Sequence, residues 1–425
     1  MRKAFVIRAK PGMAAEYQRR HDPIWSELEE TLKRHGVGNY SIFLREETGE
    51  LFGYLEVEDE ARFQQIAETE VCQRWWRHMT EVLIAQARTA RRPKRKRSEK
   101  SFTWIERKRT RMKATRILKA FARAGKQVQF VGDLDAGVII ALDMEGRLFA
   151  VLDGEVLNRV NLNAIAEEST QKMYLNPGGD GLWPAPEGTS RGYQYSTGAW
   201  RVTPGLRAAR YQVTKAGKRR AEVLAEVDLI NAQGRGIPTL FKRQITLTPG
   251  RRSITLRTVE SITYIGHAPL RRTDCLLAPW TLCQFDCGPG CEVVFPCARK
   301  AAVWDLYDDP SDAQREWRGR LCRTATSGSQ RYQIGIGAEV PWIEFRDARR
   351  GLVARRRAGR LPAGQSYIDI RDAAPGVAPA RKGVRYSVYG DTANFMEIEA
   401  VGGCPAVIRP NVEMSIEVTT RFART

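Results

Sequence analysis

The chain lacks the features that mark a membrane protein or a secreted one. Its 425 residues contain no apolar run of about 18 residues, the length that a membrane-spanning helix needs. The opening stretch MRKAFVIRAKPGM holds an apolar run of only four residues, far shorter than the apolar segment of a secretory leader. Eight cysteines in a chain of this length do not make a disulfide framework. We therefore expect a cytoplasmic protein with reduced thiols and no membrane partner.

Histidine is also scarce, with four residues in the whole chain. Few side chains can therefore exchange protons near neutral pH. Cys283, Cys287, Cys291 and Cys297 fall within 15 residues, but their spacings do not match the paired CxxC pattern of zinc sites. We find no P-loop, dinucleotide-binding fingerprint, HExxH or GxSxG motif in a supporting context. The sequence thus predicts neither a metal nor a cofactor.

The charge is strongly asymmetric, with 69 Lys and Arg against 49 Asp and Glu and a net charge of +20. Between Arg91 and Lys113 there are twelve basic residues and two acidic ones, so half of the excess lies in 23 residues. This local concentration indicates a solvated basic linker, RRPKRKRSEK and its flanks, rather than a nucleic-acid-binding protein; a weak phosphate-binding patch is the alternative. We do not expect a nucleic-acid partner.

The first hundred residues predict a small α+β domain. Apolar residues at 3–9 indicate a strand, residues 13–36 have helical periodicity, and 39–46 with 51–58 read as a hairpin. Helices are expected at 59–68 and 70–86, and SFTWIER (101–107) is a candidate closing strand. This order predicts a ferredoxin-like fold of the dimeric α/β barrel type over residues 1–107, with a basic segment from about residue 88. Its open sheet face suggests a homodimer.

The rest of the chain has a different texture. Residues 108–126 are expected to form a linker with a short helix at 115–125. From 127 to 425 the chain has short apolar runs separated by Gly, Pro, Asp and Asn, which predicts a large all-β sandwich. The segment 173–200 is dense in Gly, Pro, Trp and Tyr, and we expect an irregular loop there. The runs that indicate strands include VQFVG, GVIIALD, GRLFAVLDG, QITLTPG, SITLRTVESITYI, CEVVFP and RYSVYG.

One group of side chains in the first domain suggests a sugar site. Tyr17 and His21 are at positions i and i+4, so they share one face of a helix. Trp75 and Trp76 offer flat apolar faces with an N–H at the edge, and sugars need both aromatic faces and polar groups. The alternative is that His21 packs in the core and the tryptophans anchor it. Cys72 is expected in the core and needs no catalytic role. His78 is expected at a solvent-facing helix position, with a second pocket residue as the alternative.

The segments YQRRHDPIWSELEETLKRHG and VCQRWWRHMT resemble the L-rhamnose mutarotase family. The resemblance covers about residues 1–86, and up to 107 with a weaker match. It implies a ferredoxin-like dimer that interconverts the two anomers of L-rhamnose or a related 6-deoxy sugar without a cofactor. It also implies that His21 is the proton donor and that Tyr17, Tyr40, Trp75 and Trp76 bind the substrate.

Chemistry supports such a role for these residue types. Mutarotation needs an acid at the ring oxygen and a base at the anomeric hydroxyl, and both steps are proton transfers. We hypothesise that His21 is the acid and that Tyr17, or a water that it positions, acts at the other oxygen. Tyr40 and the tryptophans would hold the pyranose.

The second domain loosely resembles the galactose-mutarotase-like β-sandwich group, through GGDGLWPAPEG (178–188) and the strand texture. That group typically uses two histidines and a carboxylate, whereas this domain has one histidine, His267. An accessory carbohydrate-binding role is therefore expected, and the alternative is a loop that only packs over the sandwich. The candidate sugar contacts are Trp183, Glu187 and Tyr193, with Tyr195 and Trp200 nearby.

Two other functions are compatible with the sequence. A sugar-responsive binding or regulatory protein would keep the pocket but carry out no turnover. A ferredoxin-like oxygenase or haem-degrading relative would purify with haem absorbance.

Overall fold

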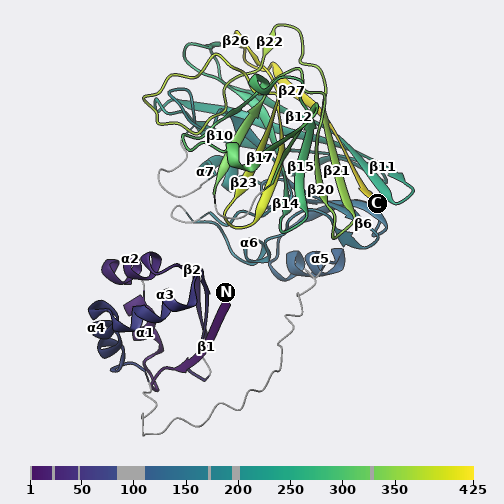
Figure 1. The fold of residues 1–425 in the computed structure, drawn as a ribbon. Helices are drawn as coiled ribbons and strands as arrows, with labels where there is room; N and C mark the ends of the chain where they lie inside the picture. The colour runs from purple at the N-terminus through teal and green to yellow at the C-terminus, as the bar shows by residue number, and fades with distance from the viewer. Residues whose placement is uncertain are drawn as a thin grey trace. The chain divides into compact units, whose positions relative to one another are not determined.

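The computed structural model describes residues 2–21, 24–45, 48–83, 111–170, 174–193, 202–325 and 330–425. The chain forms two compact units, Met1–Thr103 and Trp104–Thr425 (Figure 1). The domain boundary at residue 107 stays a prediction, and the candidate closing strand at 101–107 lies outside the described residues. Within the described ranges no helix has both the length and the apolar character needed to cross a bilayer.

The first unit is a three-stranded antiparallel sheet with helices on one face (Figure 1). Strand β3 lies between β1 and β2 and is antiparallel to both, so β1 and β2 run parallel on either side of it. This is the split βαβ arrangement of a ferredoxin-like fold, as predicted. The elements are β1 (Arg2–Arg8), α1 (Ala14–His21), α2 (Ser26–Arg34), β2 (Val37–Arg45), β3 (Glu50–Val57), α3 (Glu60–Gln64), η1 (Gln65–Glu68) and α4 (Glu70–Met79).

Two helix boundaries in this unit differ from the prediction. The periodic segment 13–36 contains two helices, because α1 ends at His21 and α2 begins only at Ser26. The proline at position 23 of the sequence is a residue that helix interiors tolerate poorly. Helix α4 ends at Met79 rather than at residue 86, and Leu83 instead forms a bridge with Ala9.

The core of the first unit lies between the sheet and the helices. Leu51, Leu55 and Val57 alternate along β3 and are buried, since successive side chains of a strand point to opposite faces. Tyr17 of α1 and Trp75 of α4 belong to the same cluster of buried residues. The opposite face of the sheet leaves Val6, Phe43 and Phe52 exposed at 63%, 60% and 48%.

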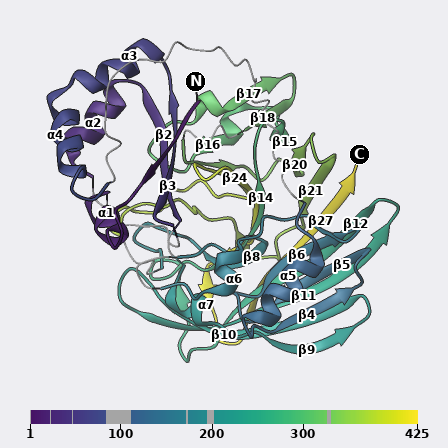
Figure 2. The same cartoon turned by 90° about the horizontal axis from the view of Figure 1, so that it is seen from below.

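The second unit is a sandwich of two large antiparallel sheets (Figure 2). The predicted runs at 128–132, 137–143, 146–154, 244–250, 253–265, 291–296 and 385–390 all lie on strands, and the predicted helix at 115–125 is α5 (Ala114–Arg123). The first sheet has the order β17 (Arg315–Arg318), β18 (Leu321–Thr324), β15 (Cys291–Pro296), β20 (Ile343–Asp347), β21 (Leu352–Ala358), β27 (Glu413–Arg424), β12 (Ser253–Tyr264), β11 (Gly236–Gly250), β10 (Arg220–Ile230) and β9 (Gln212–Gly217).

The second sheet faces the first across a shared core of apolar side chains. Its order is β16 (Val303–Asp305), β19 (Tyr332–Ile336), β23 (Tyr386–Asp391), β24 (Phe395–Val401), β14 (Ala278–Asp286), β8 (Asp180–Ala185), β6 (Arg147–Leu152), β5 (Ala136–Ala141) and β4 (Val128–Gly132), with β7 (Glu155–Val156) beside β6. The smaller elements are α6 (Leu162–Ala166), α7 (Pro204–Ala208), η2 (Lys300–Ala302), η3 (Asp312–Gln314), β13 (Leu270–Arg271) with β26 (Val407–Ile408), and β22 (Gln365–Ser366) with β25 (Cys404–Pro405).

The expectation that 173–200 is irregular throughout was wrong. Residues 180–185 form β8, a strand inside the second sheet whose six residues are all buried. A strand covered on both faces has no alternation of apolar and polar residues, so the sequence carries no period-2 signal there. Because the Gly and Pro residues of this segment indicated a loop, the prediction missed a central strand.

Candidate active site in the first unit

Helix α1 brings Tyr17 and His21 together. The two rings stack, with centroids 4.1 Å apart and an interplanar angle of 26°. This contact follows from the spacing of i and i+4 on one helix face. The helical prediction for this pair is confirmed, and Tyr17 is buried beneath His21.

A hydrogen bond fixes the orientation of the His21 ring. Nδ1 of His21 lies 3.0 Å from the backbone carbonyl oxygen of Tyr17. A carbonyl can only accept, so Nδ1 carries the hydrogen and donates it. In neutral imidazole the lone pair then resides on Nε2. The arrangement leaves Nε2 as the ring atom that can take up a proton.

Helix α4 supplies the second wall of the site. Trp75 is buried, and its ring meets His21 edge to face, with centroids 5.0 Å apart at 83°. Trp25, just before α2, packs against the same indole at 5.1 Å. His21 therefore lies between a phenol and an indole, in a partly dehydrated position.

Burial favours the uncharged form of each titratable side chain in this group, so it lowers the pKa of the histidine and raises the pKa of the tyrosines. It lowers the pKa of His21 below its ordinary value of 6.5, because the cation loses hydration, and the hydrogen bond to Tyr17 opposes this only in part. Burial also raises the pKa of Tyr17, and it raises the pKa of Tyr40 to about 12. Near neutral pH the two phenols are protonated hydrogen-bond donors and His21 is uncharged.

The other two predicted binding residues are less enclosed. Tyr40 on β2 is 40% exposed; it lies opposite Leu55 and meets Phe5 edge to face at 6.2 Å, so it belongs to the sheet face that the helices cover. Trp76 is 52% exposed and, one residue beyond Trp75, points about 100° away around the helix. Among the described residues we find no ring contact that joins Trp76 to His21.

Sequence reasoning misplaced one member of this aromatic group. His78 was expected to face solvent, but it is half-buried and its ring packs 5.2 Å from Trp25 and 5.8 Å from Trp75. The backbone carbonyl of His78 accepts a hydrogen bond of 2.5 Å from Arg20. The sequence shows that Trp75 and His78 are three residues apart, a spacing at which helix side chains are neighbours. It does not show the contact with Trp25, which lies on another segment. Cys72 is buried, as predicted.

A family model described as L-rhamnose mutarotase matches residues 2–104. The L-rhamnose mutarotase of Opitutus terrae is 60% identical over 83 residues, which are 20% of this chain and 80% of that protein. The chain belongs to the L-rhamnose mutarotase family. The family model covers almost the whole first unit and one residue beyond it, and so includes Tyr17, His21 and Trp75.

Two solved structures are similar to parts of the chain. An L-rhamnose mutarotase from Formosa agariphila is 29% identical, with a TM-score of 0.18, and covers 21% of this chain and 99% of its own. A galactose mutarotase-like protein from Lactobacillus casei is 9% identical, with a TM-score of 0.45, and covers 70% of this chain and 100% of its own.

In the second unit of this mutarotase-family chain, two of the three predicted sugar contacts lie in the core. Trp183 on β8 is buried and donates from Nε1 to Glu145 at 3.3 Å. Tyr193 is buried and donates its hydroxyl to the carbonyl of Leu276 at 2.7 Å. Tyr195 and Trp200 lie outside the described residues. The third contact, Glu187, is buried beside other charged groups.

Glu187 lies near a row of buried polar side chains that the sequence did not reveal. Burial, with a smaller contribution from Asp372, raises the pKa of Glu187 to about 8, and Arg331 and Glu399 also act on it. Cross-strand pairing places one member of the row on each of four adjacent strands: Gln333, Tyr389, Glu397 and Gln284.

The carboxyl group of Glu397 in this row is influenced by a neighbouring carboxyl group, that of Glu399. Burial and the neighbouring Glu399 raise the pKa of Glu397 well above its usual range. Glu399 accepts hydrogen bonds from Trp280 at 3.2 Å and from Gln333 at 3.1 Å. Among the described residues neither oxygen of Glu397 accepts a hydrogen bond, and the Nε2 of Gln284 has no partner. This buried row contains both hydrogen-bond donors and acceptors.

The position of Trp75 makes the pKa of His21 testable. We expect the imidazole of His21 to titrate below 6.5 in the full chain, and Trp75→Ala to move that pKa upward, because the smaller side chain lets water reach the cation. NMR titration of the His21 ring measures both values. Trp76→Ala is the matched control, since it removes an exposed indole and should leave the pKa unchanged. An equal rise in both variants would show that the enclosing wall is not Trp75.

Proposed function

We propose that the first unit interconverts the two anomers of L-rhamnose by proton transfer at His21. The observation that carries the proposal is the neutral imidazole held between Tyr17 and Trp75, with Nδ1 engaged by a backbone carbonyl. Membership of the L-rhamnose mutarotase family supports the choice of sugar.

In this reaction one nitrogen atom, Nε2 of His21, makes both proton transfers. Nε2 of neutral His21 takes the proton of the hydroxyl on the anomeric carbon. The bond from that carbon to the ring oxygen breaks, its electron pair stays on the ring oxygen, and the anomeric oxygen becomes a carbonyl. The imidazolium then gives its proton to the ring oxygen. Rotation about the C1–C2 bond and the reverse steps close the ring on the other face.

A single histidine can serve both oxygens because both are bonded to the same carbon. The lowered pKa of His21 suits this role in two ways. It keeps Nε2 unprotonated at neutral pH, and it makes the transient imidazolium a stronger acid. His21 is thus the proton donor to the ring oxygen after it has first been the acceptor.

The remaining residues would bind the sugar. Tyr17 and Tyr40 stay protonated and can donate hydrogen bonds to sugar hydroxyls. Trp75 offers an indole against the C–H face of the pyranose. Trp76, which lies apart from the stack, is the outermost of the four proposed contacts.

We also propose that the sandwich binds a carbohydrate along the buried row of Gln333, Tyr389, Glu397 and Gln284, with Glu187 at its edge. Unpaired amide and carboxyl atoms in that row support this, because buried polar groups are normally hydrogen-bonded. Trp183 and Tyr193 would then support the site from within the core rather than touch the sugar.

A homodimer and a reducing compartment complete the proposal. Val6, Phe52 and Phe43 lie directly opposite one another across the three strands and form an exposed apolar row, which a second copy would cover. The eight cysteines are buried thiols without disulfides, as expected of a cytoplasmic protein.

His21→Gln in the full chain should lower the acceleration of L-rhamnose anomer exchange by roughly 10²- to 10⁴-fold, because it removes the proton-transfer group. Saturation-transfer NMR measures the exchange. His35→Gln is the matched control, since the Nδ1 of His35 makes the same contact with a backbone carbonyl, that of Thr31 at 2.8 Å, outside the aromatic group.

The pH profile gives an independent readout of the same assignment. The wild-type acceleration should fall as the pH drops through the lowered pKa of His21, because the protonated ring cannot accept the first proton. It should be level above that pKa and absent from His21→Gln. Unchanged activity in His21→Gln would refute the assignment, and L-rhamnose binding without any exchange would identify a sugar-responsive binding protein instead.

Adding monosaccharides should slow amide hydrogen exchange in β24 of the full chain if the sandwich binds sugar, and Glu397→Gln should abolish that protection. Exchange detected by mass spectrometry over Phe395–Val401 is the measurement, with L-rhamnose, D-galactose and D-glucose as probes. Glu222→Gln on β10, in the other sheet, is the control. No protection by any of these sugars would contradict the proposed site.

Phe52→Asp should convert the proposed dimer to a monomer, because it puts a charge at the centre of the apolar row. Light scattering after size exclusion reports the mass. Val213→Asp places the same charge on the exposed edge strand β9 and should leave the mass unchanged. A wild-type monomer would rule out the dimer.

A further inference from the structure

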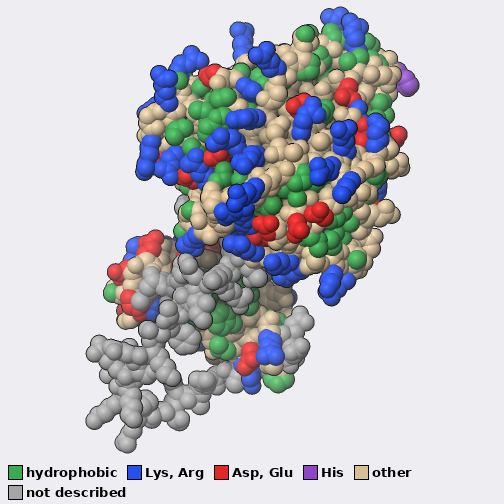
Figure 3. All heavy atoms as spheres, turned by 90° about the vertical axis from the view of Figure 1, so that its right-hand side faces the viewer, with side chains coloured by type: hydrophobic (Ala, Val, Ile, Leu, Met, Phe, Trp, Pro, Cys, Tyr) green, Lys and Arg blue, Asp and Glu red, His purple; other side chains and the backbone are tan. Residues whose placement is uncertain are grey.

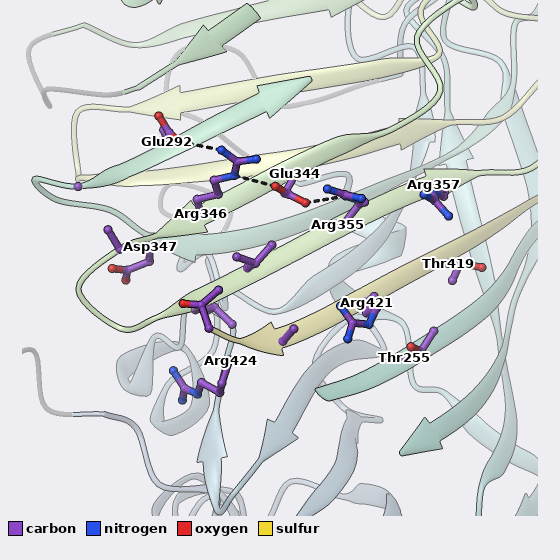
Figure 4. Close-up of a pocket in the computed structure, with 16 residues that line it drawn as sticks. Thr255, Glu292, Glu344, Arg346, Asp347, Arg355, Arg357, Thr419, Arg421 and Arg424 are labelled. Carbon is purple, nitrogen blue, oxygen red and sulfur yellow. Dashed lines mark hydrogen bonds and ion pairs between the residues drawn. The ribbon is translucent and has the colours of Figure 1, made fainter. Parts of the chain in front are cut away.

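The outer face of the first sandwich sheet carries a hollow of about 750 Å³ that the proposed function does not use (Figure 4). It lies over β15, β20, β21, β27 and β12. Alternation along β21 directs Ala354 and Arg356 into the core and Arg355 and Arg357 outward. The hollow is therefore built on paired strands, and its size is in the range of small-molecule sites, roughly 300–1,000 Å³.

One side of the hollow carries a row of linked ion pairs (Figure 4). Arg346 contacts Glu292 at 3.6 Å and Glu344 at 2.7 Å. Glu344 also accepts from Arg355 at 2.6 Å. The carboxylate of Asp347 accepts two backbone N–H groups at 3.1 Å, from Arg349 and Arg350. The acidic groups of the hollow are thus already engaged.

The other side holds two arginines without an acidic partner. Arg357 and Arg421 are exposed, and among the described residues no carboxylate pairs with either. Arg421 makes only a long contact of 3.4 Å with the hydroxyl of Ser253. In Figure 4 both lie beyond the dashed chain of ion pairs.

Strand register places these cations close together. Arg421 on β27 lies directly opposite Arg355 on β21, and Arg357 is two residues further along the same strand. Like charges directly opposite one another destabilise a sheet. A bound anion would remove that repulsion, and guanidinium groups match planar oxyanions through paired N–H donors. Basic side chains are also spread over the face of the second unit shown in Figure 3, which favours the approach of anions.

The surroundings of the two arginines suit a sugar rather than a bare ion. Thr419 lies opposite Arg357 and Thr255 opposite Arg421, so two hydroxyls stand beside the guanidinium groups. Val353 and Ala423 add apolar lining. Hydroxyls can exchange hydrogen bonds with a polyol, while methyl groups accept its C–H faces.

We propose that this hollow binds a monosaccharide that carries an oxyanion, with Arg357 and Arg421 holding the anionic group and Thr255 and Thr419 meeting the hydroxyls. The shared chemistry is an anionic oxygen group on a pyranose. Its source is either the carboxylate of a uronic acid or the phosphate of a sugar phosphate. The site is separate from His21 and does not depend on the activity proposed there.

Calorimetric titration of the full chain with D-glucuronate, D-glucose 6-phosphate and D-glucose tests this. We expect at least one anionic sugar to bind, with binding that weakens on addition of salt, and no D-glucose binding that depends on salt. Arg357→Gln and Arg421→Gln should each weaken binding by on the order of 10-fold or more, the effect of losing a hydrogen bond to a charged group. Preference for one anionic sugar over the other identifies the source.

Arg251→Gln is the charge-matched control, because Arg251 is an exposed arginine in the turn between β11 and β12 and does not line the hollow. The proposal is overturned if neither anionic sugar binds, if added salt weakens D-glucose binding as much as it weakens anionic-sugar binding, or if Arg251→Gln weakens binding as much as Arg357→Gln. The comparison of salt dependence between charged and uncharged sugars uses the wild-type chain, so it decides the matter even if a variant misfolds.

Discussion

The hydrogen bond from Nδ1 of His21 to the carbonyl of Tyr17 is the constraint on which the candidate active site depends. It turns a surface-type helix residue into an oriented imidazole with a defined tautomer. The same contact occurs at His35, whose Nδ1 meets the carbonyl of Thr31. The contact by itself therefore gives orientation and not function. What sets His21 apart is the pair of rings around it, since Tyr17 and Trp75 dehydrate the ring.

The enclosure of His21 by these two rings results from the packing of the first unit. Tyr17 and Trp75 are members of the core between sheet and helices, so the residues that stabilise the fold are also the walls of the site. Trp76 is adjacent in sequence but lies outside this stack, because neighbouring helix residues point about 100° apart. A site built on core residues is rigid, which suits the proposed reaction, in which one nitrogen reaches two oxygens of the same sugar.

The parts that sequence predicts are those with local signals. Tyr17 and His21 share a helix face because they are four residues apart. The composition and flanking turns of β12 and β4 predict both strands. Strand β8 was missed because it is buried on both faces and has no alternation. His78 was missed because its partner Trp25 comes from another segment, about fifty residues earlier in the chain. The row through Gln284 and Glu397 depends on strand register, which no local pattern reveals.

The two units differ in the kind of sugar that their chemistry can tolerate. The ring contacts of His21 are aromatic, and His21 itself is neutral near pH 7, so a charged sugar would lose hydration there without a compensating partner. The hollow on β21 and β27 has the opposite property, because Arg357 and Arg421 are exposed there and have no acidic partner among the described residues. A neutral sugar gains nothing from those charges, whereas an anionic one supplies the missing partner. In both sites selectivity follows from the cost of an unpaired charge. At His21 that cost disfavours a charged sugar, and in the hollow it favours an anionic one.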